Sequence, residues 1–157
     1  MKKIIFLIPV LFISCIKKDI KSIVINNNQS TELNLFEGKY TVHFMSKKEA
    51  NYNFSISDKE ITDIKNTYHN LDISSYDDEV LVTDSTQPII MPVSYNVYII
   101  NFSDGTKQTF KINMDLKKNP LEIKKFSQLK IFIDKLNAII KSKKEIINAP
   151  KSDFKYI

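Results

Sequence analysis

The sequence predicts an α+β domain in which two β-hairpins form an antiparallel sheet and each is followed by a helix (ββα-ββα), with both helices on one face. Two observations give this prediction. Apolar and polar residues alternate in two pairs of short segments, and an amphipathic pattern of helical period follows each pair. The composition, 43% hydrophobic and 26% charged, is that of an ordinary globular domain. A sheet with helices gathered on one face is a stable two-layer architecture.

The first hairpin is expected at residues 40–44 and 52–56, where aromatic and β-branched residues alternate with polar ones on both sides of a polar connection. Ser57 and Glu60 then have the spacing of a helix-capping box. We therefore expect a helix from about residue 58 to residue 70.

The second hairpin is expected to turn at Asp104-Gly105, because this dipeptide tolerates the positive φ angles of a two-residue type I′ turn. This turn sets the register, so that Ile99 faces Phe110 and Val97 faces Ile112. These pairs fall on one side of the hairpin, which is the side expected to face the core.

The second helix is expected to begin at Asn119, with Pro120 at its first position and Glu122 completing the cap. Between the two units, Val80 and Val82 predict a short extra strand in an otherwise long connection. The buried stripe of the second helix is predicted to consist of Phe126, Leu129, Ile133, Leu136 and Ile140.

The beginning of the chain has the layout of a cleavable export signal. A basic start is followed by a short apolar run, from Ile4 to Ile13, and then by Ser14 and Cys15. The run is too short to cross a bilayer as a helix, which needs about 20 apolar residues. The segment resembles a bacterial lipoprotein signal, although Phe12 stands where such signals usually have leucine. The resemblance implies that Cys15 carries the lipid; the alternatives are an ordinary signal peptide with an incidental thiol and a buried free cysteine.

These features divide the chain into four parts. Residues 1–14 are the expected signal peptide, 15–38 a lipidated tether, 39–143 a single α+β domain and 144–157 a C-terminal tail. In its order of elements, the region 39–140 weakly resembles uncharacterised hairpin–helix domains of bacterial lipoproteins, a resemblance that implies fold and location but no activity.

The resemblance to a lipoprotein signal implies a place in the cell envelope, and we expect an outer-membrane lipoprotein that is periplasmic or surface-exposed and is held to the membrane through the lipid on Cys15. The formal net charge is +5, but all 23 basic residues are lysine. Arginine is the residue best suited to bidentate recognition of phosphates and bases. The composition therefore predicts no nucleic-acid partner.

One surface is a candidate for binding a partner protein of the envelope or a secreted one. In the expected register, the outer face of the second hairpin carries Tyr98, Ile100 and Phe102 opposite Lys107 and Lys111, which makes an apolar row with a lysine rim. The alternative is that lysine stems or the C-terminal tail cover this row.

No residue pattern predicts catalysis, a metal site or a cofactor. His43 and His69 are the only histidines and have no ligand-like spacing. The acidic cluster of residues 77–79 lacks the spacing of a calcium loop. We therefore expect a non-enzymatic, membrane-anchored binding module. A glycan- or small-ligand-binding lipoprotein is the alternative, for which seven tyrosines could supply stacking surfaces. A hydrolase that uses His43 or His69 ranks below both.

Overall fold

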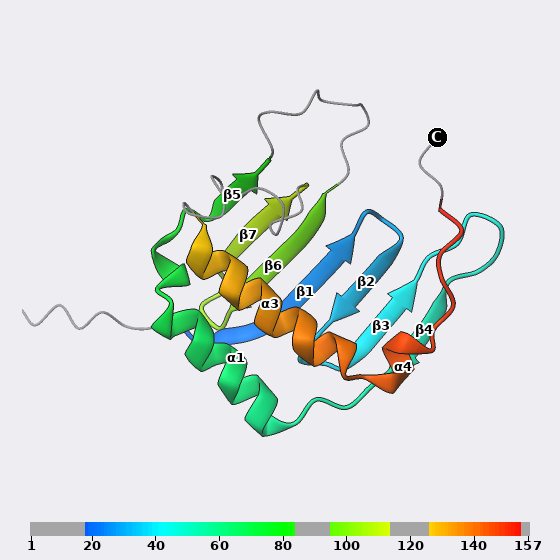
Figure 1. Cartoon of the computed structure of the whole chain (residues 1–157), viewed down its shortest axis with the longest axis horizontal. Coiled ribbons are helices and arrows are strands. Elements are labelled where there is room, and N and C mark those ends of the chain that lie inside the picture. The colour runs from blue at the N-terminus through cyan, green and yellow to red at the C-terminus, as the bar shows by residue number, and fades with distance from the viewer. Residues whose placement is uncertain (1–17, 84–94, 114–125, 155–157) are drawn as a thin grey trace, which may run out of the picture.

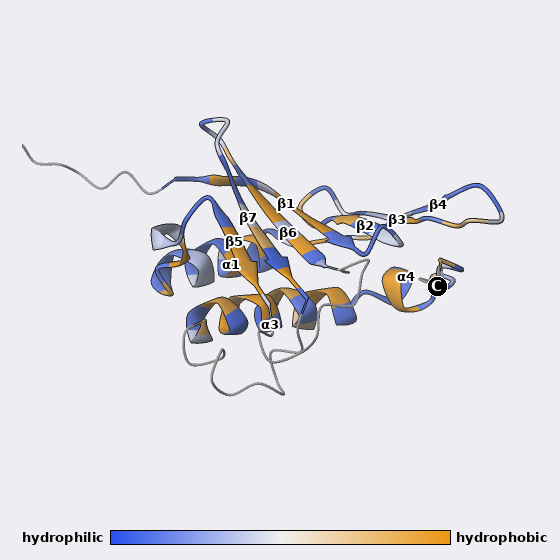
Figure 2. Ribbon diagram, turned by 90° about the horizontal axis from the view of Figure 1, so that it is seen from above, coloured by the Kyte–Doolittle hydropathy of each residue, from blue (hydrophilic) through white to orange (hydrophobic). Residues whose placement is uncertain are grey.

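The computed structural model describes residues 18–83, 95–113 and 126–154 of the chain (Figure 1). They form a seven-stranded sheet in the order β4-β3-β2-β1-β6-β7-β5. All neighbouring strands are antiparallel except β5 and β7, which are parallel. The helices lie on one face of the sheet, as Figure 2 shows. The predicted α+β class, with helices on a single face, is confirmed.

The order of the elements differs from two hairpin–helix units, so the ββα-ββα arrangement is not confirmed. Four strands precede the first helix, and three more follow it. The strands are β1 (Ile20–Asn27), β2 (Thr31–Asn34), β3 (Lys39–Val42), β4 (Ala50–Asn53), β5 (Glu79–Val82), β6 (Asn96–Phe102) and β7 (Lys107–Ile112); the helices are α1 (Asp58–Asn70), η1 (Ile73–Ser75), α3 (Ser127–Lys141) and α4 (Lys144–Ile147).

Strand β1 lies in the middle of the sheet, between β2 and β6. Ile20 and Ile23 are fully buried there. The prediction that residues 15–38 form a tether is therefore wrong from Ile20 onward. A β-bulge between Ile20 and Ser22 breaks the alternation of apolar and polar residues in β1, so its sequence lacks the regular pattern of a strand that is covered on one face.

The β6–β7 hairpin has a register one residue away from the predicted one. Tyr98 pairs with Phe110, because the loop holds three residues instead of two. The Gly105 amide donates to the Phe102 carbonyl, and the Phe102 amide donates to the Thr106 carbonyl. Gly105 has a φ of +84°, which fits a type I turn followed by a left-handed residue. A slip of one residue exchanges the two faces of a strand, so the predicted inner and outer faces of β6 are reversed, whereas Phe110 and Ile112 of β7 face the core as predicted.

Helix α1 begins and ends where the sequence predicts. The Ser57 hydroxyl accepts a hydrogen bond from the Glu60 amide, and the Glu60 carboxylate accepts one from the Ser57 amide at 2.8 Å. The capping box is thus confirmed, and Ile64 and Tyr68 form the buried side of the helix.

Helix α3 is confirmed over residues 127–141, but its buried side is broader than the predicted stripe. Phe132 and Ile139 are buried, whereas Phe126 and Ile140 are only partly covered. The predicted cap at Asn119, Pro120 and Glu122 lies outside the described residues.

The predicted extra strand at Val80 and Val82 is confirmed as β5, which pairs with β7. The buried side chain of Gln108 joins this strand pair to the segment before β5. Its amide nitrogen donates to the carbonyls of Ile73, Tyr76 and Asp77, while its oxygen accepts from the Tyr68 hydroxyl at 2.8 Å. The Gln108 side chain therefore supplies hydrogen bonds to backbone carbonyls in the non-helical segment before β5.

The described part of the predicted tail, residues 144–154, belongs to the domain. Helix α4 lies beside β4, and Asp153 accepts hydrogen bonds from the amides of Met45 and Ser46. The described domain therefore runs from Ile20 to at least Asp153, so the predicted limits at 39 and 143 are both too narrow.

A glycine is required where the chain passes from β2 to β3. Gly38 has a φ of +64°, and a Cβ there would lie 2.1 Å from the Phe54 carbonyl oxygen. The Phe54 amide donates to the Gly38 carbonyl at 2.8 Å, which brings the start of the α1 connection against this turn. Any side chain at this position would push the two backbones apart.

Candidate functional site: the β5 edge

The predicted partner surface is not exposed. Tyr98, Ile100 and Phe102 are 6%, 0% and 3% exposed and form part of the core beneath α1 and α3. Lys107 and Lys111 lie on the opposite, helix-free face of the sheet. There they pair with residues of β6 whose side chains point away from the core, in alternation with the buried ones. The prediction of an apolar row rimmed by lysine is therefore wrong, as a direct consequence of the reversed register.

Cys15 and the expected signal peptide lie outside the described residues. No helix within the described ranges is long and apolar enough to cross a membrane. The lipid attachment at Cys15 thus stays a prediction.

The two histidines lie at opposite ends of β1. The His43 amide donates to the Ser30 carbonyl, just beyond the end of β1, and its ring Nδ1 is 3.3 Å from the Glu49 carboxylate. His69 lies near Asp19, which immediately precedes β1; hydrogen bonds from Lys65 and Ser103 lower the pKa of that carboxyl, and His69 adds to the effect. An eight-residue strand spans roughly 26 Å, so the histidines do not share a site.

The acidic segment before β5 is used structurally. The Asp78 carbonyl accepts from the Thr109 amide at 2.7 Å, and Glu79 forms an ion pair with Lys111, which lowers the pKa of the Glu79 carboxyl. Among the described residues, no three histidine, cysteine or acidic side chains are grouped so that they could hold a metal ion.

Strand β5 is the last strand on its side of the sheet that the described residues form. Hydrogen bonds to β7 use the carbonyls of Asp78 and Val82. Because successive residues of a strand point their backbone groups to opposite sides, Glu79 and Leu81 direct theirs away from β7. No strand of the described ranges pairs with this edge.

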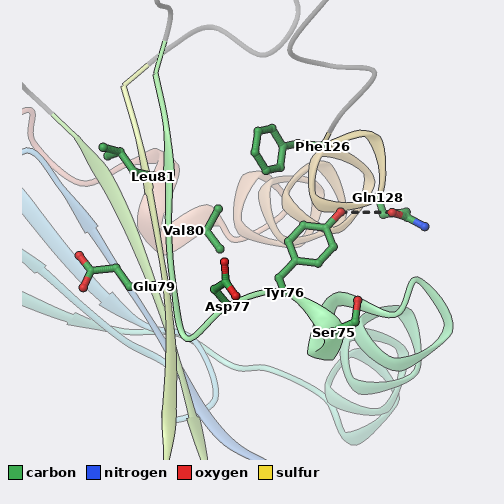
Figure 3. A pocket seen from close by; sticks show the side chains of 8 residues that line it. All are labelled: Ser75, Tyr76, Asp77, Glu79, Val80, Leu81, Phe126 and Gln128. Carbon is green, nitrogen blue, oxygen red and sulfur yellow. Dashed lines mark hydrogen bonds between the residues drawn. The ribbon is translucent and has the colours of Figure 1, made fainter.

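A hollow of about 470 Å³ adjoins the same edge, between β5 and the beginning of α3. Figure 3 shows Tyr76, Val80 and Phe126 directed toward one another within it, while Glu79 and Leu81 point to the other side of the strand. The Tyr76 hydroxyl donates to Gln128 at 3.2 Å, and its ring meets Phe110 edge-on with centroids 6.3 Å apart. The apolar part of the lining is thus fixed by packing, and polar residues such as Ser75 and Asp77 complete the walls.

Acidic groups lie on both sides of β5. Asp77 lines the hollow, whereas the Glu79 side chain lies on the other side of the strand, where it pairs with Lys111. Leu81 is 55% exposed on the helix-free face, beside Lys111 in the register. We call the outer backbone of Glu79–Val82 together with Tyr76, Asp77 and Phe126 the β5-edge groove. It offers hydrogen-bonding backbone, apolar contact and negative charge, but no paired acid, base or nucleophile.

The sequence indicated β5 but not its place in the sheet. The apolar Val80 and Val82 predict a strand, yet which edge of that strand is free depends on its parallel pairing with β7, a contact between distant parts of the chain. Likewise, Phe126 was predicted as core because it continues the apolar stripe of α3.

A comparison of the chain with protein-family models, with curated proteins and with solved structures found no match. The functional interpretation therefore depends on the geometry of this chain.

Proposed function

We propose that the protein is a lipoprotein of the bacterial cell envelope, anchored in the outer membrane through a lipid on Cys15, whose domain is a non-enzymatic binding module. Its partner is an extended segment of another envelope protein or of a secreted protein. The observation that carries the binding proposal is the outer edge of β5, which no described strand pairs with, beside a hollow with an apolar wall of Tyr76, Val80 and Phe126. An added strand would pair with this edge and insert alternate side chains into the hollow.

The short connection between Cys15 and the domain limits how far an anchored domain could stand from the membrane. Only four residues separate Cys15 from Ile20, where β1 begins. Consecutive Cα atoms are at most 3.8 Å apart, so this connection spans roughly 19 Å at most. The domain would therefore sit close to the membrane surface and act on partners that reach it there.

The groove favours a particular kind of segment. Exposed edges attract extended chains through the backbone, and the side chains of the groove then select among them. Apolar side chains of the partner would contact Tyr76, Val80 and Phe126. Lysine or arginine would lie near Asp77 and Glu79.

The anchor is tested by labelling cells that express the full chain with an alkyne fatty acid. We expect label on the wild-type protein, a mature N-terminus at Cys15, and complete loss of label in Cys15→Ala. A mature protein that starts at another residue, or an unlabelled wild type, would contradict the anchor.

Binding at the edge is tested with fluorescent octapeptides of alternating valine and lysine, or of alternating valine and glutamate. Leu81→Pro removes an outward amide while leaving the pairing with β7, because proline is tolerated on the free side of an edge strand. We expect the lysine peptide to bind and Leu81→Pro to weaken it by about tenfold, roughly the contribution of one hydrogen bond. Leu81→Ala, which keeps the amide, is the matched control. Equal binding of the two peptides, or equal effects of the two variants, would contradict the proposal.

A further inference from the structure

A second hollow, of about 260 Å³, lies on the helix-covered face at the other side of the domain. Strands β1, β2, β3 and β6 form one wall, and the end of α3 with α4 forms the other; α4 lies below β3 and β4 in Figure 2. We call it the amide pocket, after the side chains that line it: Asn27, Thr31, Tyr40, Asn96, Tyr98 and Asn137.

The lining of the amide pocket is polar but uncharged. Its polar side chains are amides and hydroxyls, and aliphatic side chains such as Leu33 and Ile146 make up the remainder. Amides and hydroxyls can both donate and accept hydrogen bonds. A charged ligand would find no opposite charge among these residues, whereas a neutral ligand with several hydroxyls would find partners for them.

Two tyrosines are held in place within this pocket. Burial raises the pKa of Tyr98 and of Tyr40, and side-chain contacts with Asn137 and with Thr31, respectively, partly offset this. Tyr40 also packs against Tyr52 across the strands, with ring centroids 6.3 Å apart. The rings are therefore oriented before any ligand arrives.

The pocket also contains a polar atom without a partner. Asn96 Oδ1 is buried and accepts no hydrogen bond within the described part of the chain. Such atoms are rare in folded proteins, because each one loses its hydration without replacement. Asn96 lies on the same face of β6 as Tyr98, so its amide is directed to the helix side, where the pocket is. A donor from a ligand would satisfy it after a small rotation of the side chain.

We propose that the amide pocket binds one pyranose sugar ring. Its volume is slightly below the roughly 300 Å³ at which pockets for drug-sized ligands begin, so it suits a single ring. The amides bind the hydroxyls, and the tyrosine and aliphatic side chains cover the apolar face of the ring. This site is independent of the β5-edge groove and of the lipid, since it shares no residue with either.

The test is a titration of the isotope-labelled full chain in lauryldimethylamine oxide micelles, followed by NMR. The probes are glucose, galactose and N-acetylglucosamine, each to about 50 mM, where a site with a Kd of about 1 mM would be filled. Gluconate, an open-chain carboxylate that has five hydroxyls but no pyranose ring, is the ligand control. We expect saturable shifts of the Asn96 and Asn137 side-chain amides with at least one sugar and none with gluconate.

Two variants link the shifts to the pocket. Asn96→Ala and Asn137→Ala should each weaken the sugar by about tenfold or more. Asn53→Ala, at an exposed position of β4, should leave the affinity for the sugar unchanged and serves as the matched control. Alanine has a higher helix propensity than asparagine, so Asn137→Ala should leave α3 intact. Circular dichroism checks this. The proposal is overturned if no sugar saturates, if gluconate binds equally well, or if both pocket variants bind like the wild type.

Discussion

The two halves of the helix-covered face are packed to different degrees. In the half formed by β6 and β7, every second side chain is buried along both strands. In the half formed by β3 and β4, Val42 is the only buried residue of eight strand residues. Figure 1 shows the reason: α1 and α3 run together over the first half, while the four-residue α4 and the C-terminal segment accompany the second.

The contrast separates what stabilises the fold from what is available for binding. The first half is held by aromatic contacts, such as the edge-on pair of Tyr68 and Phe132 at 5.6 Å. The second half is held largely by polar contacts of the last residues, such as those of Asp153. Both hollows lie where the cover of the two long helices ends: the β5-edge groove beyond one side and the amide pocket beyond the other. Packing density therefore decides where a ligand can enter.

The largest expected effect is in the densely packed half. Phe132→Ala should lower the free energy of unfolding by about 3–5 kcal/mol, because it leaves a cavity beside Tyr68. Ile131→Ala, at the neighbouring position of α3, is the matched control; this side chain is 54% exposed, and the change should be within about 0.5 kcal/mol. Urea denaturation of both variants measures the difference. Similar losses for both would contradict the assignment of the core.

Next in size is the loss of the buried amide in the same half. Gln108→Met keeps the volume but leaves the Tyr68 hydroxyl and the Ile73 and Tyr76 carbonyls without their partner, at a cost of about 2–3 kcal/mol. Tyr68→Phe should cost less, about 1 kcal/mol. The double variant should be less destabilised than the sum of the single ones, since both break the same bond. Additive losses in denaturation would show that the two side chains act independently.

The same contrast explains which elements the sequence predicts. Helix α1 is predicted at both ends because its signals are local: a capping box at Ser57 and an amphipathic pattern behind it. Strand β5 and helix α3 likewise have apolar residues at intervals typical of their type. Each of these elements can be recognised from a window of about ten residues.

The errors concern features that depend on distant contacts. The middle position of β1 follows from its pairing with β6, which lies about seventy residues further along the chain. The face of Tyr98 depends on whether the turn at Gly105 has two or three residues, and the same local sequence is compatible with both. For this reason the predicted binding surface was placed on core residues, while the two hollows, each formed by several elements, were not predicted.

A smaller loss of stability is expected when an ion pair at the boundary between the halves is removed. Lys143, between α3 and α4, pairs there with Glu60 at 2.7 Å. Hydrogen bonds from Lys143 and from the Ser57 amide hold the pKa of Glu60 at about 2, below its ordinary value of 4.5. A lowered pKa stabilises the fold above about pH 4.5, and this contribution is lost as the pH falls toward 2.

Glu60→Gln should therefore be less stable than the wild type by about 1–2 kcal/mol at pH 7, a range that allows for screening of a partly exposed pair. The difference should shrink steadily between pH 4.5 and pH 2 in urea denaturation, because the wild type loses the same charge. A difference that does not change with pH would assign the effect to the helix cap alone.

The smallest effect on global stability is expected in the weakly packed half. A substitution there should change the local opening of the structure more than the free energy of unfolding. Asp153 accepts hydrogen bonds from the Ser46 side chain and from the Met45 amide at 2.7 Å, and these contacts lower the pKa of its carboxyl. Asp153→Asn weakens them, so the Met45 amide should exchange with solvent several-fold faster while the urea midpoint hardly moves. Acidification of the wild type below its lowered pKa should reproduce the faster exchange, since the protonated carboxyl is a poorer acceptor. If the midpoint instead fell as far as it does in Glu60→Gln, the C-terminal segment would be part of the cooperative core, and the two halves would unfold as one.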